Sequence, residues 1–207
     1  MQIEIIIVGQ QDTNCYVVFD EESREAIVID PGDEPDKISA HIDARKLRPT
    51  HIIFTHAHYD HVCAVKELKE RYQAKVVMHE AEAQTYDETK KRCMSWGYDA
   101  DDFPPPDLAV KEDDEVWVGK ACFRVIHTPG HTPGGICLHG ENLLFAGDTL
   151  FLGSVGRTDR PGGNMEHLLQ SLKKLTLLNP ATRVLCGHDE ETTIGRERSS
   201  NPFMHSL

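Results

Sequence analysis

The sequence has no long apolar run and no run of basic residues. The apolar stretch within residues 3–8 is far shorter than the roughly 20 residues that a membrane-spanning helix needs. The opening MQIEIIIVGQQ has neither a basic region nor a small-residue cleavage site, so no signal peptide is expected. Lys and Arg number 22 against 34 Asp and Glu, a net charge of −12. Binding of nucleic acid needs a basic patch, so we expect neither a nucleic acid nor a membrane as partner.

Cysteine is scarce and has no motif spacing. The six cysteines are at positions 15, 63, 93, 122, 137 and 186, and no two form the C-x-x-C of a metal or redox motif. We interpret them as reduced residues that pack in the interior. Together with the missing signal peptide, they predict a cytoplasmic protein. The 207 residues contain no internal repeat and no long linker, so we expect a single domain over residues 1–207.

Strand and helix patterns alternate along the chain. Apolar residues at helical spacing indicate helices over 34–45, 60–72 and 164–177, the last capped by Asn164, and a further helix around 80–93. The stretch 84–114 also contains SWGYDADDFPPPD, whose prolines and acids predict a surface excursion. Many strands with interspersed helices indicate an α/β or α+β sandwich. The strands are predicted from β-branched runs at 3–8, 15–19, 25–30, 51–54, 75–78, 115–118, 122–126, 135–138, 142–146 and 183–186.

The most informative stretch is THAHYDHV, residues 55–62, which follows the predicted strand 51–54. Residues two apart in an extended loop can point the same way, so His56 and His58 could hold one metal ion. Asp60 and His61, further along the turn, would then face a second position. Imidazole and carboxylate without thiolate suit zinc, iron or manganese.

Three further polar motifs also follow predicted strands. They are HTPGHTPGG at 127–135, FAGDTLF at 145–151 and CGHDEET at 186–192. Each motif alone is ambiguous, and only their joint occurrence with the first one indicates a shared site. For His127 we favour a structural role, and we interpret the histidines at 41, 51, 79, 139, 167 and 205 as surface or core residues.

Together these motifs resemble the metallo-β-lactamase-fold hydrolases. Their order matches that family along residues 1–203, and TNCYVV (13–18) and VIDPGD (28–33) resemble its opening hairpin and its Asp-Pro-Gly turn. Within the superfamily the closest resemblance is to single-domain proteins similar to glyoxalase II, the hydroxyacylglutathione hydrolases. GSVGRTDRPGGN (153–164) and TTIGRERSSNPF (192–203) carry this narrower match. The C-terminal helical domain with which glyoxalase II contacts glutathione is not expected here.

The resemblance implies a fold and a set of metal ligands. The fold is a four-layer αβ/βα sandwich with two divalent ions at one edge, zinc in the first instance and iron or manganese as alternatives. Asp30 would support the ligand loop through hydrogen bonds. The implied ligands are His56, His58 and His131 for the first ion, Asp60, His61 and His188 for the second, and Asp148 as a bridge between both.

The resemblance also implies an activity. A metal-bound hydroxide would hydrolyse a small-molecule thioester such as S-lactoylglutathione, with Asp60 and Asp148 as the catalytic carboxylates. Arg157 stands where the family has a basic residue that contacts substrate. Thr158 and Asp159 replace an aromatic neighbour common in that motif, which puts glutathione as the carrier in question. Two extra acids, Asp189 and Glu190, follow the implied ligand in the fourth motif.

Several other activities use the same scaffold. A persulfide dioxygenase would need one ferrous ion, for which His56, His131 and Asp148 could supply two histidines and a carboxylate. A lactonase would use nearly the same hydroxide chemistry. A secreted β-lactamase, a nuclease and a flavodiiron reductase fit less well, because a signal peptide, a basic surface and a carboxylate at position 58 are respectively missing. A non-catalytic metal-binding scaffold is a last alternative. It fits less well, because every ligand position is filled and catalytic sites in this fold keep an open position for water.

Overall fold

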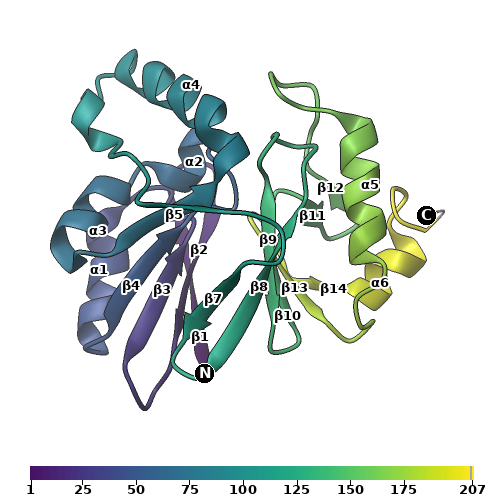
Figure 1. Cartoon of the computed structure of the whole chain (residues 1–207), viewed down its shortest axis with the longest axis horizontal. Helices are drawn as coiled ribbons and strands as arrows, with labels where there is room; N and C mark the ends of the chain where they lie inside the picture. The colour runs from purple at the N-terminus through teal and green to yellow at the C-terminus, as the bar shows by residue number, and fades with distance from the viewer. Residues whose placement is uncertain (206) are drawn as a thin grey trace.

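Two six-stranded sheets form the centre of the protein in this computed structural model, which describes residues 1–205 and residue 207 (Figure 1). The first sheet has the order β1-β2-β3-β4-β5-β6, and the second has the order β14-β13-β10-β9-β8-β7. The strands of the first sheet are β1 (Gln2–Val8), β2 (Thr13–Phe19), β3 (Glu25–Ile29), β4 (Arg48–Ile53), β5 (Lys75–His79) and β6 (Leu108–Val110). Those of the second are β7 (Glu115–Val118), β8 (Ala121–His127), β9 (Ile136–Gly140), β10 (Leu143–Gly147), β13 (Arg183–Cys186) and β14 (Thr192–Thr193), while β11 (Leu150–Phe151) pairs with β12 (Ser154–Val155).

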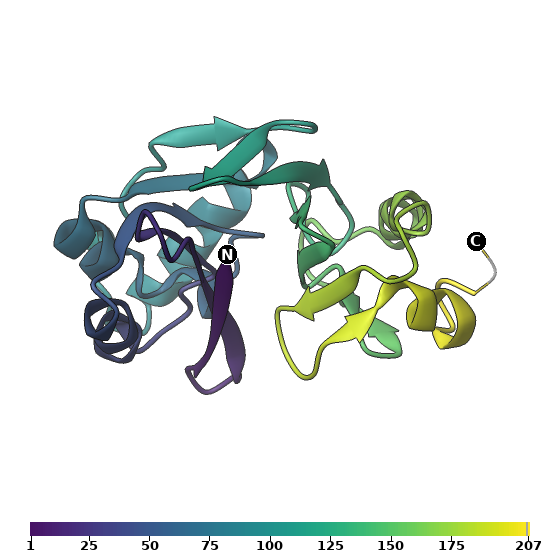
Figure 2. The same ribbon diagram turned by 90° about the horizontal axis from the view of Figure 1, so that it is seen from below.

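Helices cover the outer face of each sheet (Figures 1 and 2). On the first sheet lie α1 (Pro35–Ala44) and α3 (Val65–Tyr72), and on the second lie α5 (Met165–Leu175) and α6 (Ile194–Ser200). Two further helices follow the C-terminal ends of strands in the first sheet: α2 (Tyr59–Val62) comes after β4, and α4 (Ala83–Met94) comes after β5. Short 3-10 turns lie at Glu80–Glu82 and Ala100–Asp102. No helix among the described residues is long and apolar enough to cross a membrane.

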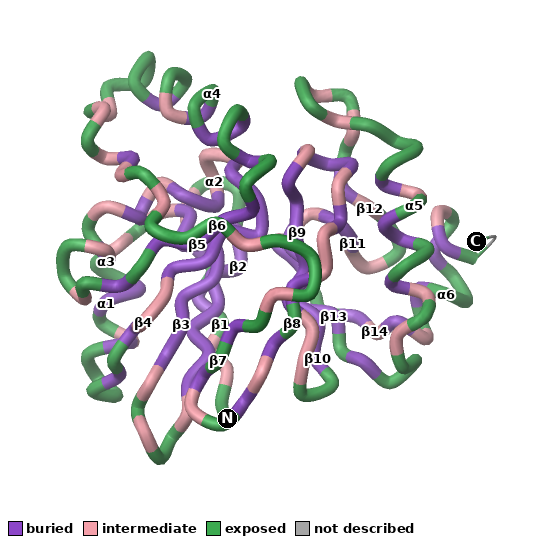
Figure 3. Tube along the Cα trace, viewed as in Figure 1, coloured by how far each residue is buried: buried purple, intermediate pink, exposed green. Residues whose placement is uncertain are grey.

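Alternating side chains divide the interior into three hydrophobic cores. In β3, Ala26 and Val28 pack toward the helices, whereas Ile27 and Ile29 pack toward the second sheet. This is the period of two that a pleated strand imposes. In β10, Phe145 faces the first sheet while its neighbours face α5 and α6. Three cores separate four layers, and the predicted four-layer sandwich is thereby confirmed (Figure 3).

Most predicted elements are present within a few residues of their expected ends. Asn164 caps α5, because its side chain accepts a hydrogen bond of 3.0 Å from the His167 backbone N–H. The cysteines form no disulfide among the described residues, as expected, although Cys63 and Cys122 are only half-buried. The surface excursion contains one anchor, because Phe103 is buried against Tyr86 of α4.

The helix predicted over 60–72 is two helices rather than one. The backbone leaves helical geometry at Ala64 (φ −92°, ψ 11°), whose N–H donates to the carbonyl of Pro31 instead of to the preceding turn. The apolar spacing continues across this break, so periodicity could not reveal it. The break separates a single short turn, which holds Asp60 and His61, from the longer helix that packs on the sheet.

Candidate metal centre

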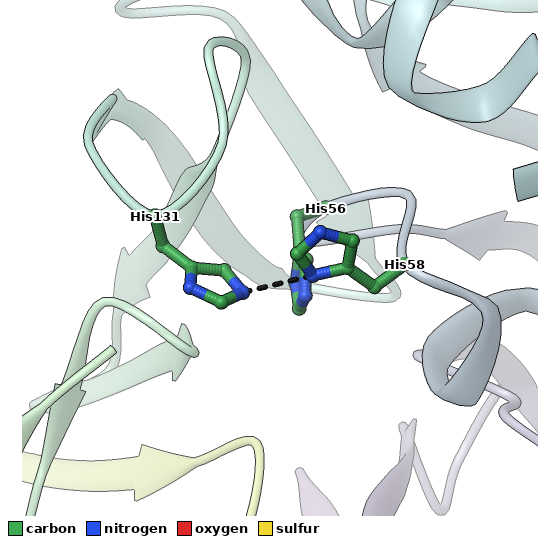
Figure 4. A group of neighbouring side chains, drawn as sticks. All are labelled: His56, His58 and His131. Carbon is green, nitrogen blue, oxygen red and sulfur yellow. Dashed lines mark hydrogen bonds between the residues drawn. The ribbon is translucent and has the colours of Figure 1, made fainter. Parts of the chain in front are cut away.

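Two of the predicted ligands lie on the loop that follows β4. His56 is 2% exposed, and His58 is half-buried with an extended backbone (φ −70°, ψ 152°) that begins α2. His131, from the loop after β8, points at the same spot (Figure 4). Its Nε2 lies 2.9 Å from Nδ1 of His58, and one nitrogen from each of the three rings falls within 4.8 Å of the others.

A second group lies beside the first. Asp60 and His61 come from α2, and His188 comes from the loop after β13. Nε2 of His188 is 3.3 Å from Nε2 of His61 and 3.4 Å from Oδ2 of Asp60. The ligand atoms of these three residues again lie within 4.8 Å of one another.

Asp148 lies between the two groups. Its Oδ1 is 3.5 Å from Nε2 of His61 and 3.6 Å from Nε2 of His188. Its Oδ2 is 3.5 Å from Nε2 of His131 and 4.0 Å from Nε2 of His56. One carboxylate therefore presents one oxygen to each group.

The donor atoms fit divalent metal ions. Two atoms that each lie about 2.1 Å from a tetrahedral ion are roughly 3.4 Å apart, close to the spacings seen here. Within the described part of the chain, Nε2 of His56 and Oδ1 of Asp148 are buried and have no hydrogen-bond partner. Unsatisfied buried polar atoms are costly and call for an explanation, which an ion would provide.

Three of the five histidines in the two groups are oriented by contacts to Nδ1. Nδ1 of His131 donates to the backbone carbonyl of Arg157 at 2.7 Å, and Nδ1 of His188 donates to the carbonyl of Gln11 at 2.9 Å. Nδ1 of His61 faces Oδ2 of Asp30 at 3.0 Å. A proton held on Nδ1 leaves the lone pair of Nε2 free in these three rings, and this is the tautomer that binds a metal through Nε2.

The charges of the centre shift the pKa values of its members. Burial and the neighbouring histidines lower the pKa of His56 well below its usual value, which keeps this ring neutral. Burial also lowers the pKa of His61, but the carboxylates of Asp148, Asp30 and Asp60 outweigh burial and raise it to about 10. An excess of negative charge around a proton marks a place where a cation is stabilised.

Asp30 lies behind the candidate ligands. It is 1% exposed, and its carboxylate accepts hydrogen bonds from the backbone N–H of Thr55 at 2.7 Å and from the Thr55 hydroxyl at 2.6 Å. Its backbone has a positive φ of 52°, which Asp tolerates better than most residues. Asp30 therefore fixes the start of the loop that bears His56 and, through His61, also contacts the second group.

A second buried carboxylate beside the centre is that of Glu82, which no motif in the sequence indicated. This residue is 0% exposed, and its two oxygens accept hydrogen bonds from the backbone N–H groups of Ala57 at 2.8 Å and Gly134 at 2.7 Å. Thr89 of α4 donates to the Ala57 carbonyl at 2.7 Å. The peptide groups on both sides of Ala57 are thus held, and one carboxylate joins the loop of His56 and His58 to the loop after His131.

Replacing Glu82 with alanine should weaken the centre without touching a ligand. Two buried N–H groups would lose their acceptor, at about 1–3 kcal/mol each. Metal affinity should fall roughly 10- to 100-fold, as it does when residues that orient ligands are removed. Urea unfolding of metal-free protein and competition with a chromophoric chelator measure the two effects. Glu80→Ala, an exposed position on the same turn, is the matched control, and unchanged metal affinity in Glu82→Ala would assign Glu82 to stability alone.

Glycine beside His188 makes room for the central carboxylate. A Cβ added to Gly187 would lie 2.3 Å from Oδ1 of Asp148 and 3.0 Å from Cε1 of His61. Both separations are shorter than a van der Waals contact, so only glycine lets β13 bring His188 this close. The sequence GH within the fourth motif thus reflects the geometry of the ligands.

The remaining predicted positions lie outside the cluster. The guanidinium of Arg157 pairs with Asp159 through two hydrogen bonds of 2.7 Å and is 56% exposed. His127 stacks on His79, with ring centroids 4.0 Å apart, and its Nε2 lies 3.0 Å from the carbonyl of Pro133. His127 therefore has the structural role that was favoured for it.

Comparison with protein families decides the superfamily. The sequence model of the metallo-beta-lactamase superfamily matches residues 8–188. The chain belongs to this superfamily. Among curated proteins, it is 44% identical to an uncharacterized protein of Aquifex aeolicus (strain VF5), over 100% of this chain and 99% of that protein. It is 35% identical to the hydroxyacylglutathione hydrolase GloC of Haemophilus influenzae, over 100% and 99% of the two chains.

Solved structures of the superfamily share the whole fold. TTHA1623 in a di-iron-bound form is 38% identical with a TM-score of 0.87, covering 97% of this chain and 99% of that chain. ETHE1 from Myxococcus xanthus is 31% identical with a TM-score of 0.82, covering 99% and 89%. The B3 metallo-beta-lactamase BLEG-1 is 32% identical with a TM-score of 0.84, covering 98% and 99%. The family match and the geometry of the His/Asp cluster support a metal-binding site, whereas relatives with such different names at similar identity leave the substrate open.

Proposed function

We propose that this protein is a hydrolase that binds two divalent metal ions and cleaves a small-molecule thioester of the S-lactoylglutathione type. The observation that carries the proposal is the position of Asp148, which presents one carboxylate oxygen to each of two separate groups of ligands. His56, His58 and His131 would hold one ion, Asp60, His61 and His188 the other, and Asp148 both. Bound together, such ions supply Lewis acidity and activate water near neutral pH.

The chain's own groups would position the reactants. Burial raises the pKa of Asp60, but contact with His188 and the charge of His61 outweigh burial and leave it well below its usual value. Asp60 is therefore ionised at neutral pH, and its carboxylate accepts a hydrogen bond from the attacking water and orients it. A thiolate is a good leaving group, so the reaction needs no strong general acid at the sulfur. This favours a thioester over an amide as the substrate.

The relatives support the same choice. The Haemophilus influenzae relative bears the name hydroxyacylglutathione hydrolase and matches along the full length of this chain. The di-iron-bound TTHA1623 supports a pair of ions in this fold, and iron as well as zinc as candidate metal. The six unpaired cysteines suit the reducing cytoplasm, where we place the protein.

A mononuclear-iron persulfide dioxygenase is the second candidate. His56, His61 and Asp148 offer two imidazoles and one carboxylate within 4.8 Å, the ligand set of non-haem iron oxygenases, with His61 in the place that the sequence analysis gave to His131. This reaction consumes oxygen, whereas thioester hydrolysis does not. A lactonase would share the hydrolytic chemistry and differ only in its substrate.

Metal analysis with a substrate panel distinguishes the candidates. Protein purified without added metal is assayed by elemental analysis and with S-lactoylglutathione, glutathione persulfide and a homoserine lactone. We expect close to two ions per chain, thioester hydrolysis without oxygen uptake, and a loss of at least about 10²-fold in kcat after chelation, restored by metal. One iron per chain with oxygen uptake on the persulfide would replace the proposal by the second candidate. Thioester turnover that survives complete metal removal would refute both.

A further inference from the structure

A cavity of about 700 Å³ opens in front of the metal centre. It is lined by five of the proposed ligands and also by three arginines, Arg92, Arg157 and Arg160. A cavity of this size holds a ligand of drug or cofactor dimensions. Four carboxylates line the cavity as well, and two of them, Asp60 and Asp148, belong to the metal centre.

The three arginines differ in what they contact. Arg157 is neutralised by its two-pronged pair with Asp159. Arg160 is half-buried, and among the described residues no carboxylate lies within 4.0 Å of its guanidinium. Arg92 likewise has no acidic partner there, and its guanidinium lies 5.0 Å from the ring centre of Trp96 and 5.5 Å from that of Tyr59.

The two unpaired arginines line the same cavity, and so does Tyr59, against whose ring Arg92 lies. Two acids outside the metal centre line the cavity as well. Glu88 accepts a hydrogen bond from Gln84 at 2.9 Å, and Asp189 is exposed beside His188. Neither forms an ion pair with the two arginines, so their charge remains available to a ligand.

We propose that Arg160 and Arg92 form an anion subsite that binds a carboxylate of the thiol carrier. The substrate class is thus an acyl thioester whose carrier is an acidic peptide or acid rather than a neutral thiol, an inference that rests on the proposed function. Guanidinium groups bind carboxylates through two parallel hydrogen bonds, and aromatic faces hold Arg92 in place. Arg157, the residue that sequence pattern selects, is already occupied by Asp159 and is not the contact.

Direct binding tests the subsite without any catalysis. The probe is S-methylglutathione, added to the metal-loaded protein in a Trp117→Phe background. Trp96 is then the only tryptophan left of the two in the sequence, and it lies beside Arg92. We expect Arg160→Gln and Arg92→Gln each to raise the Kd roughly 10- to 100-fold, the loss expected for a charge-assisted pair. Arg157→Gln should raise it less than either.

The same experiment can overturn the proposal. A Kd in Arg160→Gln equal to that of the parent, in protein with an unchanged Tm, would do so. A larger loss in Arg157→Gln than in Arg160→Gln would also do so, and would return the contact to Arg157. No binding of the probe to the parent protein at millimolar concentration would likewise reject an anionic peptide carrier.

Kinetics with two carriers separate this inference from the proposed function. S-lactoylglutathione carries carboxylates, and S-lactoyl-N-acetylcysteamine carries none. We expect Arg160→Gln to raise KM about 10-fold or more for the first and to leave KM and kcat for the second within about twofold. If the parent hydrolyses both esters but the variant loses them equally, the subsite is wrong and the hydrolase proposal stands. If the parent hydrolyses neither, the hydrolase proposal fails and the binding measurement alone decides the subsite.

Discussion

Replacing Asp148 with alanine should abolish activity and empty at least one metal position, while the fold is retained. Its carboxylate faces both groups, with oxygens 3.5 Å from Nε2 of His61 and 3.5 Å from Nε2 of His131. Loss of a shared ligand removes a charge from both ions at once, so we expect kcat to fall by roughly 10³-fold or more, beyond the loss of a single stabilising donor. Elemental analysis, circular dichroism and thioester turnover measure the three outcomes.

Glu190→Gln is the matched control for this prediction. It removes one carboxylate from an exposed position two residues after His188, and we expect metal content and turnover within about twofold of the parent. Asp148→Ala with two ions still bound would show that Asp148 is not a ligand. Asp148→Ala that has lost its circular dichroism spectrum would require the milder Asp148→Asn to be measured instead.

Replacing Asp30 with alanine should cause a large loss of stability. Asp30 is buried, accepts two hydrogen bonds from Thr55 and faces the imidazole of His61 at 3.0 Å. Removing one partner of a buried charged contact costs about 3–5 kcal/mol, because the other partner is left uncompensated. We therefore expect the free energy of unfolding of metal-free protein to fall by this amount in urea titrations.

Asp30→Asn tests the cause of that loss. Asparagine tolerates the positive φ and keeps one oxygen, so it should lose less than alanine. If both variants unfold at the parent's urea midpoint without metal, the hydrogen bonds of Asp30 are not stabilising and its role is confined to the ions. Measuring each variant with and without zinc separates the two contributions.

The His/Asp cluster was predictable because its side chains occur in short sequence motifs. Each candidate ligand follows a strand that its own run of β-branched residues predicts. These strands end at the same edge of the sandwich, which brings the motifs together. The elements that were missed are β6, β11, β12, β14 and α6, which have two to seven residues. Runs of two or three residues carry no periodicity, so pairing partners alone define them.

The supporting residues were not predictable for a different reason. Glu82 contacts Ala57 and Gly134 through their backbone N–H groups, which any sequence would offer. Nothing in the stretch EAEAQ (80–84) distinguishes this buried acid from its exposed neighbour Glu80. The arginines pose a similar problem, because only the pairing with Asp159 distinguishes Arg157 from Arg160. Side-chain partners that come from distant segments require the folded chain.

The division of the ligands between the two sheets has a consequence for assembly. Each group takes two residues from the loop and turn after β4 and one from the second half of the chain, with Asp148 also from that half. Neither half alone supplies a complete group of these side chains, so ions bound at this centre would link the two halves only after both have docked. Metal uptake should therefore be a late event in maturation, and occupancy reports on a finished fold rather than on a preformed peptide motif.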